Sequence, residues 1–258
     1  MFRIIILSVT LLVSASGWST TPSTAMTTTT PSIASAVDHD RIYTAYLSND
    51  MGEWGAELSR CSALPSLSAD DRFALCNYYY GYVAYILDRQ DKRDVERLIS
   101  QWEEYISSLE DERYKPSSLL VFRSSIQAYR ARMYPLKSLA YITRSINLLE
   151  KALETSATDP LAVGLKGNAK FYSPAIAGGS KTEAIKYFTS ALTLLSADEY
   201  ASDKVFRWNR CAMELCLAQA YEKTDQTAKA LAQARKSLAR EPRFDYMKNV
   251  FLPSIDPQ

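Results

Sequence analysis

Apolar side chains recur at spacings of three and four residues along most of the chain, as in helices with one apolar face. The clearest case is the segment 181–196. There Ser180 and Glu183 form the S-x-x-E pattern of a capping box, which predicts that a helix begins at about Lys181. One face of this helix carries six apolar residues: Ala184, Ile185, Phe188, Ala191, Leu192 and Leu195. Such a face needs a partner, so the sequence predicts packed helices.

The same pattern returns at 227–242. This stretch lies within a segment 211–244, in which a break near Asp225 separates two helices and Pro242 closes the second. This unit resembles a tetratricopeptide (TPR) repeat, which is a pair of packed helices. The resemblance implies an all-α fold, a right-handed solenoid of antiparallel helix pairs that forms a TPR-like superhelix.

Looser copies of the unit occur earlier in the chain. Gly81 and Gly167 match the small position of a first helix, and a further pair is predicted within 119–153. The second helix of the Gly81 copy has its own apolar stripe: Val95, Leu98, Ile99, Trp102, Ile106 and Leu109. Segments 38–47 and 51–64 predict a first pair that caps the stack.

Four of the chain's eight glycines fall in residues 164–179, which predicts a turn there. We expect at least one of Gly178 and Gly179 to have positive φ. The stretch GNAKFYSPAIAGGSKTEAIKYFTSAL also resembles a motif of exported bacterial TPR-like proteins, including those of Bacteroidetes and the TPR partner proteins of solute-uptake systems. This resemblance covers roughly residues 38–250.

The N-terminus predicts export. Residues 1–19 carry Arg3, an apolar run too short to span a membrane, and small residues, as a signal peptide does. An uncleaved anchor is the alternative. Residues 20–37 are rich in Ser and Thr and predict a disordered tether, and 38–258 form the helical-repeat domain. We therefore expect a periplasmic or secreted protein with no transmembrane segment after cleavage.

The charge distribution and the scarcity of catalytic residue types exclude several classes of function. Thirty basic and twenty-nine acidic residues are scattered, which argues against nucleic acid. The single histidine, His39, disfavours histidine-based metal sites and nucleophiles, and with Asp38 and Asp40 it is interpreted as a solvated helix start. The GGSKT run lacks the glycine before lysine that a phosphate loop needs. The sequence predicts no enzyme, no metal site and no cofactor.

The seventeen tyrosines suggest recognition, because aromatic rings with a polar tip suit contact surfaces. The TPR resemblance implies that seven residues face a concave groove: Tyr78, Tyr82, Tyr85, Asn168, Phe171, Gln219 and Glu222. The alternative is that the tyrosines fill helix interfaces. We expect the groove to bind a protein or peptide partner in the cell envelope, or a small molecule. An accessory subunit of an uptake system and a hydrolase are the alternative functions.

The four cysteines are an even number in a chain predicted to be exported. Cys211 and Cys216 stand five apart on one predicted helix and point about 140 degrees apart, so they should not bond to each other. Cys61 and Cys76 lie near the facing ends of consecutive predicted helices and could form a disulfide staple. The alternative is that all four are small buried thiols.

Overall fold

The computed structural model describes residues 35–256, and every regular element in that range is helical. Twelve α-helices form the body: α1 (His39–Ser48), α2 (Met51–Ser62), α3 (Ala69–Ile86), α4 (Lys92–Asp111), α5 (Pro116–Met133), α6 (Ser138–Thr155), α7 (Pro160–Tyr172), α8 (Lys181–Leu194), α9 (Asp198–Ala201), α10 (Arg207–Glu222), α11 (Thr227–Arg240) and α12 (Leu252–Ile255). A π-helical turn (Met247–Phe251) and three 3₁₀ turns (Pro135–Lys137, Ala175–Ala177 and Lys204–Phe206) join them.

Polar caps mark where several helices begin. The side chains at these N-cap positions accept a hydrogen bond from a backbone N–H of the first turn, which replaces a bond that the helix cannot make internally. For α8 the cap is Ser180, whose Oγ accepts from Glu183 N–H at 3.2 Å. The other half of the expected capping box is absent, because the Glu183 carboxylate pairs with Lys170 at 2.5 Å. The capped starts are those of α1, α2, α3, α4, α7 and α8.

Two glycines make the turn before α8. Gly178 has φ of +81°, a left-handed conformation that costs glycine little. Gly179 donates to the Pro174 carbonyl at 3.0 Å, and a Cβ on it would overlap the backbone carbonyl oxygen of Ser173. The turn thus depends on conformational freedom at Gly178 and on the absence of a side chain at Gly179.

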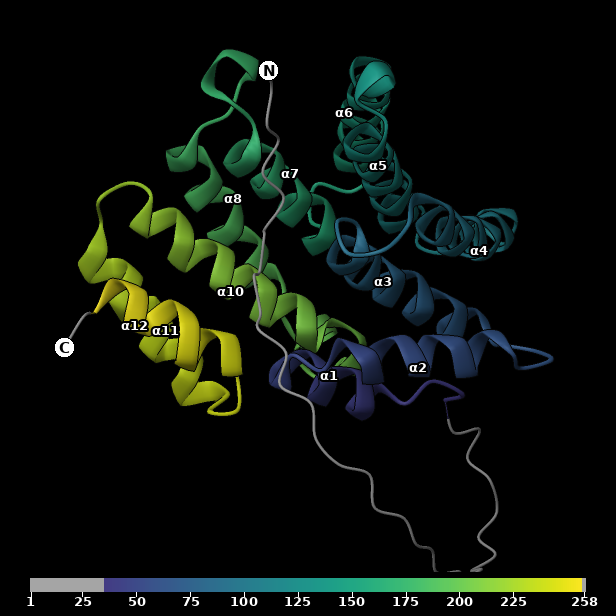
Figure 1. Cartoon of the computed structure of the whole chain (residues 1–258), viewed down its shortest axis with the longest axis horizontal. Helices are drawn as coiled ribbons and strands as arrows, with labels where there is room; N and C mark the ends of the chain where they lie inside the picture. The colour runs from purple at the N-terminus through teal and green to yellow at the C-terminus, as the bar shows by residue number, and fades with distance from the viewer. Residues whose placement is uncertain (1–34, 257–258) are drawn as a thin grey trace, which may run out of the picture.

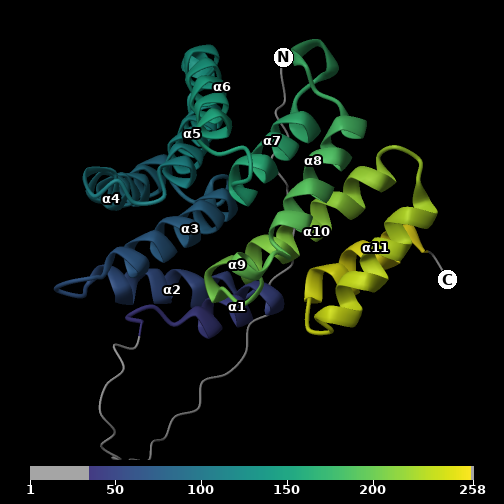
Figure 2. The same ribbon diagram turned by 180° about the vertical axis from the view of Figure 1, so that it is seen from behind.

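Consecutive helices pack in pairs: α3 with α4, α5 with α6, α7 with α8, and α10 with α11 (Figure 1). The stripe predicted for α4 faces the interior, with Val95, Ile99, Trp102, Ile106 and Leu109 fully buried. Figure 2 shows the same pairs from behind, with the α5–α6 pair on the opposite side of the molecule from α11.

The N-terminal helices pack against α10 rather than capping an open end. Trp54 of α2 lies edge-on to Trp208 of α10, with ring centroids 5.3 Å apart, and Trp54 is fully buried. Asn77 of α3 and Asn209 of α10 exchange two hydrogen bonds of 2.7 and 3.1 Å inside the core. The expected cap is therefore wrong in its placement, because the aromatic faces of α1–α3 are buried against α10.

The segment just before α1 is part of the folded body. Ser35 Oγ and Ala36 N–H donate to the Asp71 carboxylate at 2.7 and 3.0 Å, and Val37 is buried. The tether expected over 20–37 is thus wrong for residues 35–37, because Ser35 and Ala36 bond to α3 and the Ala36 carbonyl accepts from Arg60 of α2. The predicted signal peptide (1–19) and residues 20–34 lie outside the described residues.

The four cysteines are buried and unbonded in this structure. Cys61 Sγ lies 3.3 Å from Glu57 Oε1 on its own helix and 3.7 Å from the Ala36 carbonyl oxygen. Burial raises the pKa of Cys61 to about 12. The expected Cys61–Cys76 staple is absent here, because the Cys61 thiol is directed toward these oxygens.

Candidate functional site

The three groove tyrosines on α3 lie in different surroundings. Tyr78 is 1% exposed, and its hydroxyl is 2.7 Å from His39 Nδ1. Its ring meets Trp54 edge-on at 6.0 Å, so the groove position expected for Tyr78 is wrong and the helix-interface alternative holds. Tyr82 is half-buried against Gly55, and the half-buried Tyr85 carries the Arg89 guanidinium 4.2 Å above its ring.

Two of the remaining groove residues are also engaged within the helices. Phe171 is 7% exposed and packs edge-on against Tyr172 at 4.8 Å. Glu222 is partly exposed and pairs with Lys223 at 3.0 Å. Asn168 and Gln219 differ, because each has a side-chain oxygen that is covered from solvent and has no hydrogen-bond partner among the described residues.

These two amides belong to a group of polar side chains that we call the inner-face polar cluster: Tyr80 of α3, Asn168 and Tyr172 of α7, and Cys216 and Gln219 of α10. Asn168 Nδ2 donates to the Tyr80 hydroxyl at 3.4 Å, which joins α7 to α3. The Tyr172 hydroxyl lies beside the Cys216 thiol without a hydrogen bond of ordinary geometry. Gln219 follows Cys216 by one helical turn.

The cluster is neutral and partly accessible. Burial raises the pKa of Tyr80 to about 12 and that of Cys216 to about 12, so both keep their protons at neutral pH. Tyr80, Asn168, Tyr172 and Gln219 each keep some exposure, although the unpartnered atoms themselves are covered. The cluster can therefore offer hydrogen bonds, and nothing in it is set up to exchange a proton near pH 7.

A buried aromatic side chain adjoins these polar groups. The Trp208 ring lies 5.9 Å from that of Tyr80, and its indole N–H is also buried without a partner. Gln127 of α5 has an unpartnered buried oxygen as well. Each such group costs about 1–3 kcal/mol when it is left without a partner. A ligand that supplied the missing partners would recover part of that cost.

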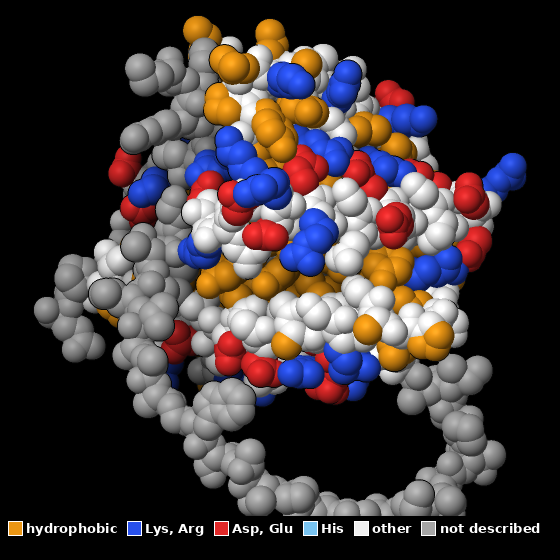
Figure 3. All heavy atoms as spheres, turned by 45° about the vertical axis from the view of Figure 1, so that its right-hand side comes forward, with side chains coloured by type: hydrophobic (Ala, Val, Ile, Leu, Met, Phe, Trp, Pro, Cys, Tyr) orange, Lys and Arg blue, Asp and Glu red, His pale blue; other side chains and the backbone are white. Residues whose placement is uncertain are grey.

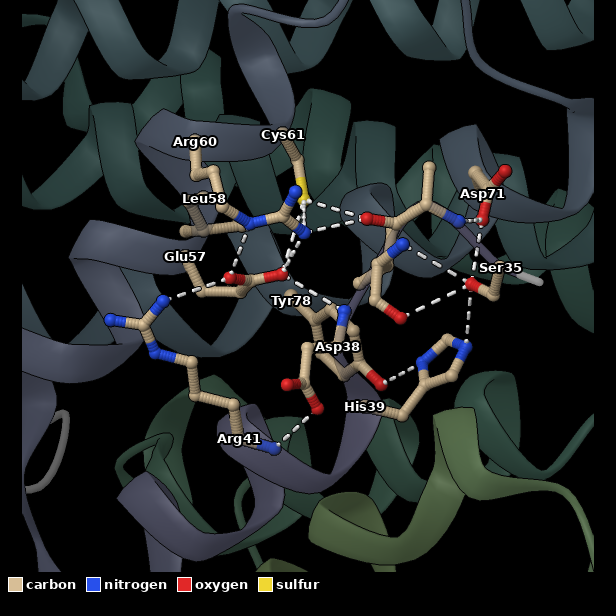
Figure 4. Close-up of polar contacts among 12 residues, drawn as sticks. Ser35, Asp38, His39, Arg41, Glu57, Leu58, Arg60, Cys61, Asp71 and Tyr78 are labelled. Atoms are coloured by element: carbon tan, nitrogen blue, oxygen red, sulfur yellow. Dashed lines mark hydrogen bonds and ion pairs between the residues drawn. The ribbon is translucent and has the colours of Figure 1, made fainter. Parts of the chain in front are cut away.

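A second candidate place is the surface hollow of about 630 Å³ next to the start of α1. Its wall includes residues 35–40, Arg60, Leu64 and Lys204. Figure 4 shows the polar contacts around it: Glu57 accepts from Arg41, Arg60 and the Asp38 N–H, and His39 lies between Ser35 and Tyr78.

Electrostatics indicate a structural role for this hollow. Burial opposes ionisation of Glu57, but hydrogen bonds from Arg60 and the Asp38 N–H outweigh it and lower the pKa of Glu57 to about 2. Lys204 is bound to Asp40 at 2.7 Å. The charged groups thus hold one another and fix the N-terminal segment. Unlike the inner-face polar cluster, they leave little hydrogen-bonding capacity for a ligand.

Sequence reasoning selected Asn168 and Gln219 but missed Tyr80 and Tyr172. Tyr172 follows Asn168 by four residues and so shares its helix face, which was a readable signal. Tyr80 lies in a run of tyrosines whose individual directions the sequence does not distinguish.

Neither a cluster of metal-ligating side chains nor a membrane-crossing helix occurs in residues 35–256. No group of three His, Cys, Asp or Glu side chains in that range is close enough to hold a metal ion. None of the helices in the described part of the chain combines the length and apolarity needed to cross a membrane.

Comparisons with known proteins add one finding on the fold. No family model matches the chain, and no curated protein matches it. Among solved structures, the helical fold is similar to that of a haemophore. That structure is the HusA haemophore from Porphyromonas gingivalis, which is 18% identical, with a TM-score of 0.52 over 74% of this chain and 97% of that chain. At this identity the similarity concerns the fold.

Proposed function

We propose that this chain is an exported, non-catalytic binding protein with TPR-like stacking of its helix pairs, and that its ligand binds at the inner-face polar cluster. The observation that carries the proposal is the presence of three covered atoms without partners, Asn168 Oδ1 and Tyr172 OH on α7 and Gln219 Oε1 on α10, with Asn168 bonded to Tyr80. Natural proteins rarely leave such atoms unpaired without a reason.

The cluster's chemistry favours a peptide segment as the ligand. Amide oxygens such as those of Asn168 and Gln219 accept hydrogen bonds, so the ligand has to supply N–H or O–H donors. A peptide backbone supplies both donors and acceptors, and its side chains can pack on the partly exposed rings of Tyr80 and Tyr172. The partner would be a protein of the cell envelope.

A tetrapyrrole is the second candidate, favoured by the similarity in fold to a haemophore. The rings of Tyr80 and Tyr172 keep some exposure, so a planar macrocycle could stack on them, and a tyrosine oxygen is one of the protein ligands that haem iron accepts. In that case the protein would act as an accessory subunit of an envelope uptake system.

The hydrolase alternative has little support. His39, the chain's only histidine, lies at the N-terminal hollow, where its ring nitrogens face Ser35 and Tyr78. The nucleophile and base of a hydrolase need mutual geometry and an accessible substrate position. The thiols of Cys61 and Cys216 are buried with raised pKa values, which disfavours thiolate chemistry.

The test compares wild type with an Asn168→Leu/Gln219→Leu variant in selection of binding peptides from a display library and in haemin titration followed by absorbance. We expect peptides that bind wild type and lose about tenfold or more in affinity for the variant. The variant removes two unpartnered oxygens but also the hydrogen bond from Asn168 to Tyr80, so urea denaturation of both proteins accompanies the binding measurements.

Gln233→Leu on α11 is the control, since it replaces the same kind of side chain outside the cluster. Haemin binding that Tyr172→Phe weakens would support the second candidate. The proposal is wrong if neither probe binds, or if the double variant binds as wild type does.

A further inference from the structure

The α5–α6 hairpin carries apolar side chains near its turn that are half or more exposed. Leu136 is 103% exposed, Leu139 78% and Ile146 50%. We call these three residues, with Lys137 and Arg144, the hairpin tip. Figure 3 shows hydrophobic and basic side chains gathered at the upper end of the molecule, where this hairpin ends.

Leu139 and Ile146 belong to an apolar stripe of α6 that is packed farther along the helix. Leu139, Ile146, Leu149 and Leu153 follow at helical spacing. Leu149 is 4% exposed, and Leu153 packs on the core. Only the half of the stripe near the turn, Leu139 and Ile146, is left largely uncovered by the described residues. The apolar side chains of that half are therefore not explained by packing within the folded body.

The charge at the tip has one sign. Residues 113–149 contain no Asp or Glu. Arg123 and Arg130 in that stretch pair with Glu110 and Glu103 of α4. Lys137 and Arg144 are exposed, and no carboxylate in the described part of the chain pairs with them. The tip therefore presents leucines together with two uncompensated cations.

We propose that the hairpin tip inserts its leucines into the surface of an anionic phospholipid membrane. A side chain as exposed as Leu136 projects from the protein, and fluid lipid accepts a projecting apolar group without a shaped pocket. Anionic headgroups complement Lys137 and Arg144. Tyr134 and Tyr141, with ring centroids 6.3 Å apart, lie at the base of the tip, where amphipathic rings suit the headgroup layer.

This contact is independent of the proposed ligand site. The hairpin tip is built from the turn after α5 and the first half of α6, whereas the inner-face polar cluster is built from α3, α7 and α10. The membrane assay contains neither peptide nor haemin. Its outcome therefore leaves the proposed function untouched.

The test is flotation with vesicles, using the exported protein purified from an expressing bacterium with its N-terminus determined. Vesicles of phosphatidylcholine with phosphatidylglycerol are compared with vesicles of phosphatidylcholine alone. We expect wild type to bind the anionic vesicles and to be released by salt. Leu136→Ser/Leu139→Ser should bind about tenfold or more weakly, and Lys137→Glu/Arg144→Glu about fivefold or more weakly.

Val250→Ser is the matched control, since Val250 is also an exposed apolar residue but lies near the C-terminus. It should bind vesicles as wild type does, and circular dichroism should show that every variant folds. Equal vesicle binding by wild type and the double serine variant overturns the proposal. So does a self-associated state in light scattering that the serine variant abolishes, because the tip would then contact a second copy.

Discussion

At the residue scale, Gly178 and Gly179 are needed for different reasons, and alanine at each position tests them separately. Gly178→Ala should lower the free energy of unfolding by about 1 kcal/mol, because φ of +81° strains any residue with a Cβ. Gly179→Ala should cost more, about 1–3 kcal/mol, because its Cβ would overlap the Ser173 carbonyl oxygen, which is backbone and cannot rotate away.

Urea denaturation measures both values. Nothing lies within 4 Å of a Cβ on Gly178, so alanine there is strained without being crowded. The reverse order of destabilisation, or no loss at Gly179, would contradict this description of the turn.

His39 gives the protein a pH dependence that one substitution isolates. Burial lowers the pKa of His39 below its ordinary value of 6.5, against the opposing charges of Asp203 and Asp71. In the pH range between its folded and unfolded pKa values, the unfolded chain binds more protons. The stability from neutral His39 is present above 6.5 and is lost as the pH falls through the folded-state value.

We expect the free energy of unfolding to fall between about pH 7.5 and about pH 5.5 in wild type, and less so in His39→Gln. Asp40 and Glu57, whose pKa values are about 2, titrate below that range and should not contribute. Equal slopes in denaturation of the two proteins would show that His39 is not the sensor.

At the element scale, the Asn77–Asn209 pair ties α3 to α10. Asn209→Ala would leave the Asn77 amide buried without that partner, and we expect a loss of about 1–3 kcal/mol. Asn77→Ala/Asn209→Ala should cost less than the sum of the single changes, because the partners share one interaction. Thermal denaturation of the four proteins measures the cycle, with Asn249→Ala as an exposed control. Additive losses would mean that the pair does not couple the helices.

The sequence predicts individual elements well and their distant contacts poorly. The start of α8 and the buried stripe of α4 follow from local patterns, because capping and helical periodicity act within a few turns. The burial of Tyr78 and the half-uncovered stripe of α6 do not. Each depends on whether another helix packs against that face. The sequence of a helix shows its apolar stripe but not whether a partner covers it.

At the scale of the whole molecule, the sequence predicts which neighbouring helices pair, but not that the N-terminal helices pack against α10. Short loops bring neighbouring helices together, so pairs such as α7–α8 follow from chain order. The contact of Trp54 with Trp208 joins residues from opposite ends of the fold and leaves no repeating signal. The candidate site shares this limit, since Tyr80 meets Asn168 only because α3 lies beside α7.

The Trp54–Trp208 contact also affects when the chain can complete its core during synthesis. Trp54, Tyr46 and Tyr80 are available early in synthesis, but Trp208, which all three rings contact, comes only with α10. A nascent chain therefore carries an uncovered aromatic surface through most of its production, and such surfaces promote aggregation. A chain terminated before α10 would keep that surface uncovered, so the growing polypeptide is exposed to aggregation until α10, which begins about four fifths of the way along the chain, has emerged.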